Sequence, residues 1–333
     1  MKRPWGLLDK VLHRLDHDRG WDYVGCVSFE DRHVDVLRHF SDRLTDRRVI
    51  VRVTNEGQSD FHDACIERIN EHSRALENGN LAVAADFVDA TFEFNLPTVQ
   101  EKVLELADAS DGRVLVDMSC MPKRFLFLIL KTLILSDKIK DLVVTYAIPA
   151  QYANDTLAGA TNALGELPGS RGPNAELEIT PQVMIISVGY LPFDLSQASE
   201  ALVTDVPKQV IFPFPTSIQN YRRNWDSLQS IFNDAALIPD PIRVDGRDVS
   251  YAFDVIKDLT DNGKIAANLY PFGPKTHSLA LGLYSLACNN ASLWYAQPTR
   301  YNPKYSSGIR FISGKPEIYG YLVKYNGANL YSI

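Results

Sequence analysis

The strongest constraint on the fold of this chain is an internal repeat. Residues 112–152 begin with a glycine and a basic residue, and continue through an apolar run, a short Pro-Lys loop and an apolar stretch of helical length. Residues 263–301 follow the same plan, and both stretches end in Ala-x-Pro-x-x-Tyr. The Pro-Lys pairs are Pro122-Lys123 and Pro274-Lys275. The repeat predicts two related α/β units in tandem.

Earlier matches keep the same order along the chain. Tyr23–Glu30 and Ser187–Asp194 share Val-Gly, three further residues, and then Phe and an acid. Strand patterns at 49–53 and 209–212 each precede a helical pattern, at 61–77 and 218–232. Strands that alternate with helices favour right-handed crossovers and a mainly parallel sheet in each half.

These patterns predict how the chain divides into domains. We expect an N-terminal amphipathic helix over 1–20 and a first Rossmann-like half over 21–155. Glycines and prolines among small and acidic residues indicate a linker over 156–180. A second Rossmann-like half over 181–333 should end in a β-hairpin within 309–333, because Gly314, Gly320 and Asn326-Gly327 separate runs that contain Tyr and Val.

The composition is that of an ordinary soluble globular protein, with 45% hydrophobic and 23% charged residues. A net charge of −7 argues against a protein that coats DNA or RNA. The longest apolar run, 125–135, is too short to span a membrane, so we expect a cytoplasmic protein that does not associate with membranes. The four cysteines have neither metal-site nor disulfide spacing, so we expect buried thiols, no metal and no cofactor.

The two Pro-Lys loops are the candidate ligand sites. Ligands of open parallel sheets bind beyond the carboxyl ends of the strands, and each loop joins such an end to a helix N-terminus that favours an anion. A proline in the first helical turn is also common for conformational reasons alone, and a lysine beside it can simply be solvated. The candidate ligand-binding residues are Ser119, Lys123 and Arg124 in the first loop, and Gly273, Lys275, Thr276 and His277 in the second.

A third candidate segment follows the second repeat. Arg300, Tyr301 and Lys304 offer cations and a phenol, which are groups that bind phosphates, riboses or bases. The alternative is a polar loop beside the hairpin. The first half keeps Tyr152 in the equivalent place and carries no cation there, so we expect the second half to dominate binding.

The sequence indicates where a ligand would bind more clearly than it indicates which reaction, if any, takes place there. Neither half contains a Walker A motif or a GxGxxG turn after its first strand, and no nucleophile elbow is present. His277 has the side chain to donate to a phosphate or to act as a general acid or base. If the protein is an enzyme, a phosphodiesterase or other hydrolase with His277, Lys275 and Tyr301 around the scissile group is the expected form.

The second repeat resembles a known family. The run Asn268–Leu283 is similar to the strand, Gly-Gly-Thr-Lys-x-Met loop and apolar helix of CRISPR-associated Rossmann-fold (CARF) domains, with Gly273 and Lys275 in matching places. Pro274 and His277 stand where that family has Thr and Met. Two such units in one chain look like the SAVED domain of bacterial antiviral signalling. The resemblance implies recognition of a cyclic or linear oligonucleotide, with Gly273, Lys275 and Thr276 as contact positions.

The sequence therefore leads to one main functional hypothesis. We expect a regulatory binding protein of a bacterial defence or stress system, which senses a nucleotide-type phosphorylated ligand in the cleft formed by its two halves. A cyclic oligonucleotide is one candidate ligand. No effector motif stands out in the sequence, so we expect a separate protein partner. The alternatives are the hydrolase described above and a ligand-free structural subunit of a defence complex.

Overall fold

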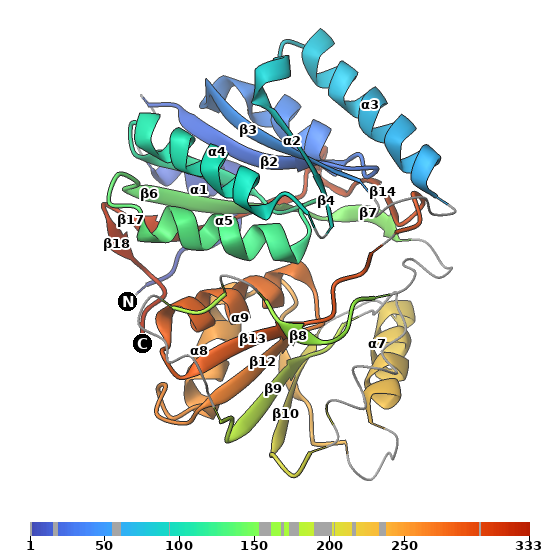
Figure 1. Ribbon diagram of the computed structural model, residues 1–333, viewed down its shortest axis with the longest axis vertical. Coiled ribbons are helices and arrows are strands. Elements are labelled where there is room, and N and C mark those ends of the chain that lie inside the picture. Colours follow the sequence, from blue (N-terminus) through green and yellow to red (C-terminus); the bar gives the residue numbers. More distant parts are fainter. Residues whose placement is uncertain are drawn as a thin grey trace. The chain divides into compact units, whose positions relative to one another are not determined.

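The structure is a computed structural model whose elements are drawn in Figure 1. It falls into two compact units, one of residues 1–159 with 299–330 and the other of residues 160–298 with 331–333, and each is described by itself. The residues that the structure describes are 2–15, 19–54, 61–92, 94–152, 161–167, 170–172, 180–189, 202, 204–214, 218–232, 238–299 and 301–333.

The first unit is built on a mainly parallel sheet in the order β1-β17-β6-β5-β2-β3-β4. Strands β2 to β6 pair in parallel, whereas β17 is antiparallel to both β6 and β1. Every residue of β2 and β5 is buried, as expected for strands covered on both faces. The strands are β1 (Trp5–Leu7), β2 (Trp21–Val27), β3 (Leu44–Thr54), β4 (Phe87–Thr91), β5 (Arg113–Asp117), β6 (Asp141–Ala147) and β17 (Ile318–Tyr325).

Helices cover this sheet. Helices α4 and α5 pack side by side on one face (Figure 1), and α2 contacts α3. The helices of this unit are α1 (Leu8–Arg14), α2 (Arg32–Phe40), α3 (His62–Asn78), α4 (Leu96–Ala109) and α5 (Lys123–Leu135), with short 3-10 turns η1 (Ser41–Arg43) and η2 (Ala84–Asp86). The remaining strands are β7 (Pro149–Tyr152), β14 (Ser306–Ile309), β15 (Phe311–Ile312), β16 (Lys315–Pro316) and β18 (Ala328–Asn329).

The second unit has a sheet in the order β11-β10-β9-β12-β13-β8. All neighbours are parallel except β8, which is antiparallel to β13. Helix α8 packs against α9. The elements are β8 (Gly165–Glu166), β9 (Val183–Ser187), β10 (Lys208–Pro213), α7 (Ile218–Ile231), β11 (Ile242–Val244), α8 (Val249–Leu259), β12 (Ala267–Pro271), α9 (Lys275–Ala287) and β13 (Ala291–Tyr295).

The predicted fold class is confirmed in its coarse form: mixed α/β, with mainly parallel sheets flanked by helices and a C-terminal strand hairpin. The parallel strands follow one order, since β4-β3-β2-β5-β6 corresponds to β11-β10-β9-β12-β13. In each sheet the chain connections diverge between two central strands, β2 and β5 or β9 and β12. This topological switch point is where open α/β sheets bind ligands at the carboxyl edge.

One of the sequence matches does not occupy equivalent places. Gly25 lies inside β2, whereas Gly189 lies beyond the end of β9. A Cβ on Gly25 would lie 2.5 Å from the ring of Tyr23, which packs over it, whereas a Cβ on Gly189 would lie 3.0 Å from Gly273 Cα. The shared Val-Gly pair therefore meets two different steric demands.

The N-terminus differs from its predicted structure, whereas the C-terminal hairpin forms. Among the described residues of the expected helix over 1–20, Leu8–Arg14 are helical, whereas Trp5–Leu7 pairs with β17 and Trp5 packs on Tyr319 and Tyr321. The Asn326-Gly327 turn has positive φ at both residues and connects β17 to β18, as predicted.

The boundaries of the units also differ from the prediction. Residues 299–330 belong to the first unit instead of the second half, because β17 completes the first sheet beside β6. Part of the expected linker over 156–180 belongs to the second unit, where β8 pairs with β13 and Thr161 forms a bridge with Pro298. In the described part of the chain, no helix combines the length and the apolarity that a membrane crossing needs.

The packing of Tyr23 over Gly25 gives a test of the first core. Tyr23 is fully buried and donates from its hydroxyl to Asp117, so its ring has no room to move away from a new methyl group. We expect Gly25→Ala to lower the free energy of unfolding by about 1–3 kcal/mol, measured by urea denaturation. Gly165→Ala is the matched control, because its Cβ would meet only the Ala163 carbonyl oxygen at 4.0 Å. Equal stabilities of the two variants would contradict this packing.

Candidate functional site

The carboxyl edge of the second sheet brings two backbone loops into direct contact at the switch point. A Cβ on Gly273 would overlap Ser187 Oγ and lie 3.1 Å from the Val188 carbonyl oxygen. A Cβ on Gly189 would lie 3.1 Å from the nitrogen of Pro274. The loops after β9 and β12 therefore approach each other at a distance that only glycine permits.

Helix α9 begins at Lys275, directly after this contact. Pro274 occupies the N-cap position with φ −58°, an angle that its ring fixes, and the side chain of Lys275 is half-buried. The first turn of a helix carries N–H groups that have no acceptor within the helix, and its dipole favours negative charge. The predicted start of the helix at the Pro-Lys pair is confirmed, and the residues here suit an anion.

A second cation, which the sequence did not single out, lies beside this helix start. The buried hydroxyl of Thr276 donates to the carbonyl oxygen of Gly246, which fixes the loop after β11 to the first turn of α9. Arg247 follows in that loop and binds Asp245 through two parallel hydrogen bonds of 3.0 and 2.9 Å. These hydrogen bonds from Arg247 are the main reason that the pKa of Asp245 lies below its usual value. The sequence signal that could have identified Arg247 was its place just after the short strand Ile242–Val244.

His277 is a structural residue in this fold. Its side chain is fully buried, with Nε2 3.1 Å from the Asp245 carbonyl oxygen and Nδ1 3.4 Å from Ser187 Oγ. Burial lowers its pKa to about 4, so the ring is neutral near pH 7. A carbonyl can only accept, so Nε2 carries the proton and Nδ1 accepts from Ser187. The ring connects β9, β11 and α9, and it does not face solvent as a ligand contact or general acid–base would.

The first Pro-Lys loop is arranged differently. Ser119 is fully buried, where its hydroxyl donates to the Asp117 carboxylate and accepts from the Ala147 N–H at 2.8 Å. Ser119 therefore joins the ends of β5 and β6 instead of facing a ligand. Lys123 and Arg124 begin α5 and are half-buried. Within the described residues, no hydrogen-bond acceptor lies in reach of the buried Nε of Arg124.

The third candidate segment belongs to a different unit from the second loop. Arg300 lies outside the described residues. Tyr301 and Lys304 belong to the first unit, whereas Gly273, Lys275, Thr276 and His277 belong to the second. The ring of Tyr301 packs against the first unit, and Lys304 is exposed.

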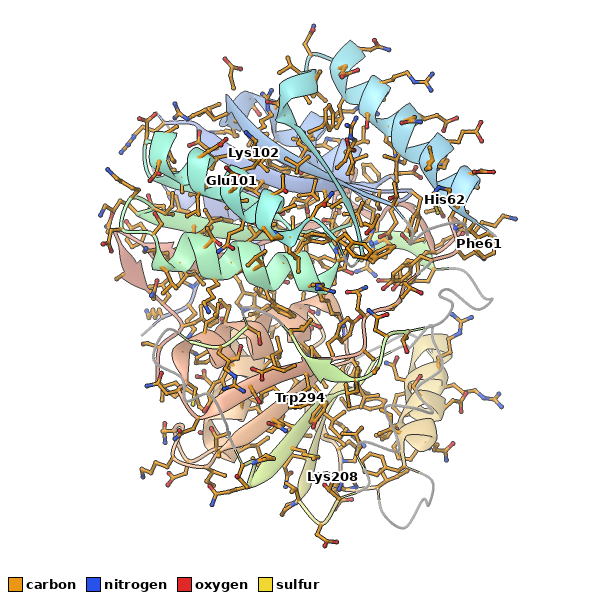
Figure 2. All side chains as sticks on the ribbon, viewed as in Figure 1. Phe61, His62, Glu101, Lys102, Lys208 and Trp294 are labelled. Carbon is orange, nitrogen blue, oxygen red and sulfur yellow. The ribbon has the colours of Figure 1, made fainter. Side chains whose placement is uncertain are left out.

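The described residues contain no group of three or more His, Cys, Asp or Glu side chains that could hold a metal ion. All four cysteines are buried, as predicted, and none of them is in a disulfide. Lys208, labelled in Figure 2, begins β10 and so lies at the amino edge of the second sheet, opposite the candidate site. It donates to the carbonyl oxygens of Thr204 and Val206.

Comparison with known protein families gives no match, and neither does comparison with curated proteins.

The burial of His277 makes the stability of the second unit depend on pH. Its pKa is about 4 in the folded protein and about 6.5 in an unfolded chain, so the unfolded state binds more protons between these values. The stabilisation is complete above about pH 6.5 and is lost as the pH falls towards 4, with a total of about 3 kcal/mol. We expect His277→Gln to reduce this pH dependence, measured by urea unfolding at pH 7 and pH 4.5.

His13→Gln is the matched control, because His13 is exposed on α1 in the other unit. This control should keep the wild-type pH profile. If His277→Gln also keeps it, the ring is not buried as a neutral group.

Proposed function

We propose that this protein is a regulatory binding protein that senses a nucleotide-type phosphorylated ligand at the carboxyl edge of its second sheet. One observation carries the proposal: at the switch point, Gly189 and Gly273 approach backbone to backbone immediately before the cationic start of α9. This contact fixes the loop that leads into α9, so the N–H groups of the first helical turn are held in place for a phosphate, and the helix N-terminus supplies the favourable dipole.

The charges around this helix start support the same ligand class. Lys275 and Arg247 are the chain neighbours of Thr276 and Gly246, so the hydrogen bond between those two residues brings the segments that carry both cations together at the first turn of α9. Arg247 is already paired with Asp245, and 40% of its side chain is exposed. A phosphate can therefore compete with the Asp245 carboxylate for the guanidinium, which binds both anions in the same bidentate way.

The arrangement favours binding over hydrolysis. His277 was the candidate general acid or base, and its ring is buried, neutral and bonded on both sides by the protein. General acid–base catalysis needs a titrating group within hydrogen-bond reach of the substrate. We therefore prefer a sensor to the phosphodiesterase or other hydrolase, and we propose that ligand occupancy is passed to a partner protein.

The resemblance of Asn268–Leu283 to CARF domains supports a role in bacterial defence, with an oligonucleotide as the ligand. The common strand order of the two sheets adds support for an origin by duplication, as in the SAVED domain. The second unit carries the matching loop, so we place the ligand there.

Isothermal titration of the full chain against nucleotides, linear oligonucleotides and cyclic oligonucleotides tests the proposal. We expect heat with at least one member, and at least a tenfold weaker Kd for Lys275→Ala, because a charge-assisted hydrogen bond contributes about 1.5–3 kcal/mol. Lys264→Ala is the matched control, since Lys264 is exposed and precedes β12 at the amino edge.

Other outcomes would contradict particular parts of the proposal. No heat with any member would remove the ligand class. Equal losses for Lys123→Ala and Lys275→Ala would favour a symmetric site over one in the second unit. A new product on chromatography after incubation would favour the hydrolase.

A further inference from the structure

A surface segment of the first unit covers the carboxyl edge of its own sheet. This segment, Tyr301–Ile309, is called the strap. The Tyr301 ring lies 6.1 Å from that of Phe29 and 5.1 Å from that of Phe92, which follow β2 and β4. At its other end, β14 pairs with β7, which follows β6. Since β4 and β6 flank the parallel part of the sheet, the strap spans the edge that includes the switch point between β2 and β5.

The strap is fastened to a buried ion pair. Glu30 and Arg32 are 5% and 1% exposed, and their charged groups lie 2.5 Å apart. Arg32 also donates to the Ala147 carbonyl oxygen at 3.0 Å. The hydroxyl of Ser306 donates to the Glu30 carboxylate and so joins the strap to this pair. Buried charges need such partners, because an unpaired one is costly.

Further contacts hold the strap along its length. Phe61 and His62, labelled in Figure 2, mark the start of α3, and Cys65 on the same helix end lies 3.8 Å from the Tyr301 carbonyl oxygen. Tyr305 packs edge-on against Tyr152, with ring centroids 6.0 Å apart. The strap thus contacts the segments that follow β2, β4 and β6, as well as the start of α3.

Most side chains of the strap are partly exposed, unlike those of the core strands. Within it only Ser306 and Ile309 are buried, whereas all of β17 except Tyr325 is buried. Segments with few buried apolar contacts undock at a lower free energy than the sheets beneath them. The sheet itself does not depend on the strap, since β2 and β5 pair with their own neighbours.

We propose that the strap is a releasable cover of the carboxyl edge of the first sheet. Docked, it lies across the segments that follow β2, β4 and β6 and closes the edge at which Lys123 begins α5. Undocked, it leaves this edge open while the sheet stays folded.

Hydrogen exchange of the full chain, measured by mass spectrometry, tests the cover. We expect Ser306→Ala to speed exchange of 301–309 at least tenfold, with β2, β5 and β17 as protected as in the wild type. Tyr301→Ala should act in the same way, because it removes the ring packed against Phe29 and Phe92. Ser307→Ala is the matched control, because Ser307 is exposed on β14.

Two results would overturn the proposal. In one, neither variant changes exchange in the strap. In the other, the strap and β2 lose protection together, which would make the strap an integral part of the core. The experiment uses no ligand, so its failure would leave the proposed nucleotide site in the second unit untouched.

Discussion

The pairing of β17 with β6 and β1 is the interaction on which the arrangement of the first unit depends. It inserts a C-terminal strand between an N-terminal strand and the last parallel strand of the sheet. Gly320 lets α1 approach this strand, since a Cβ there would lie 2.8 Å from Leu8. Because β17 pairs within the first sheet, the chain that follows β13 returns to the first unit at residue 299.

As a result, the carboxyl edges of the two sheets differ in what covers them. The edge of the first sheet is covered by Tyr301–Ile309, which is bonded to Glu30 and packed on Phe92. At the edge of the second sheet, Gly189 and Gly273 are in contact, and the buried His277 side chain joins the start of α9 to the Asp245 carbonyl oxygen. The strand orders correspond, so the difference between the edges comes from the connecting segments and not from the sheets.

The candidate site was predictable to the extent that it depends on local chemistry. The Pro-Lys pairs do begin helices α5 and α9, because proline at a helix start and an apolar stretch after it are local signals. The burial of His277 was not predictable, since a histidine in a first turn faces a ligand or the core depending on which elements pack against it. Arg247 was missed because its loop is brought to α9 by tertiary hydrogen bonds, from Thr276 to Gly246 and from His277 to Asp245.

By itself, the sequence determined the alternation of strands and helices, the α/β class and the positions of the helix starts, because periodicity, glycine and proline act over a few residues. Only the tertiary structure decided that residues 299–330 join the first unit, that Ser119 and His277 are buried, and that Tyr301 packs on Phe29 and Phe92. Each of these depends on contacts between residues far apart in the chain, and the pairing of β17 is the clearest case. Local preferences cannot specify which strands pair, since an apolar strand can satisfy its backbone hydrogen bonds beside more than one neighbour.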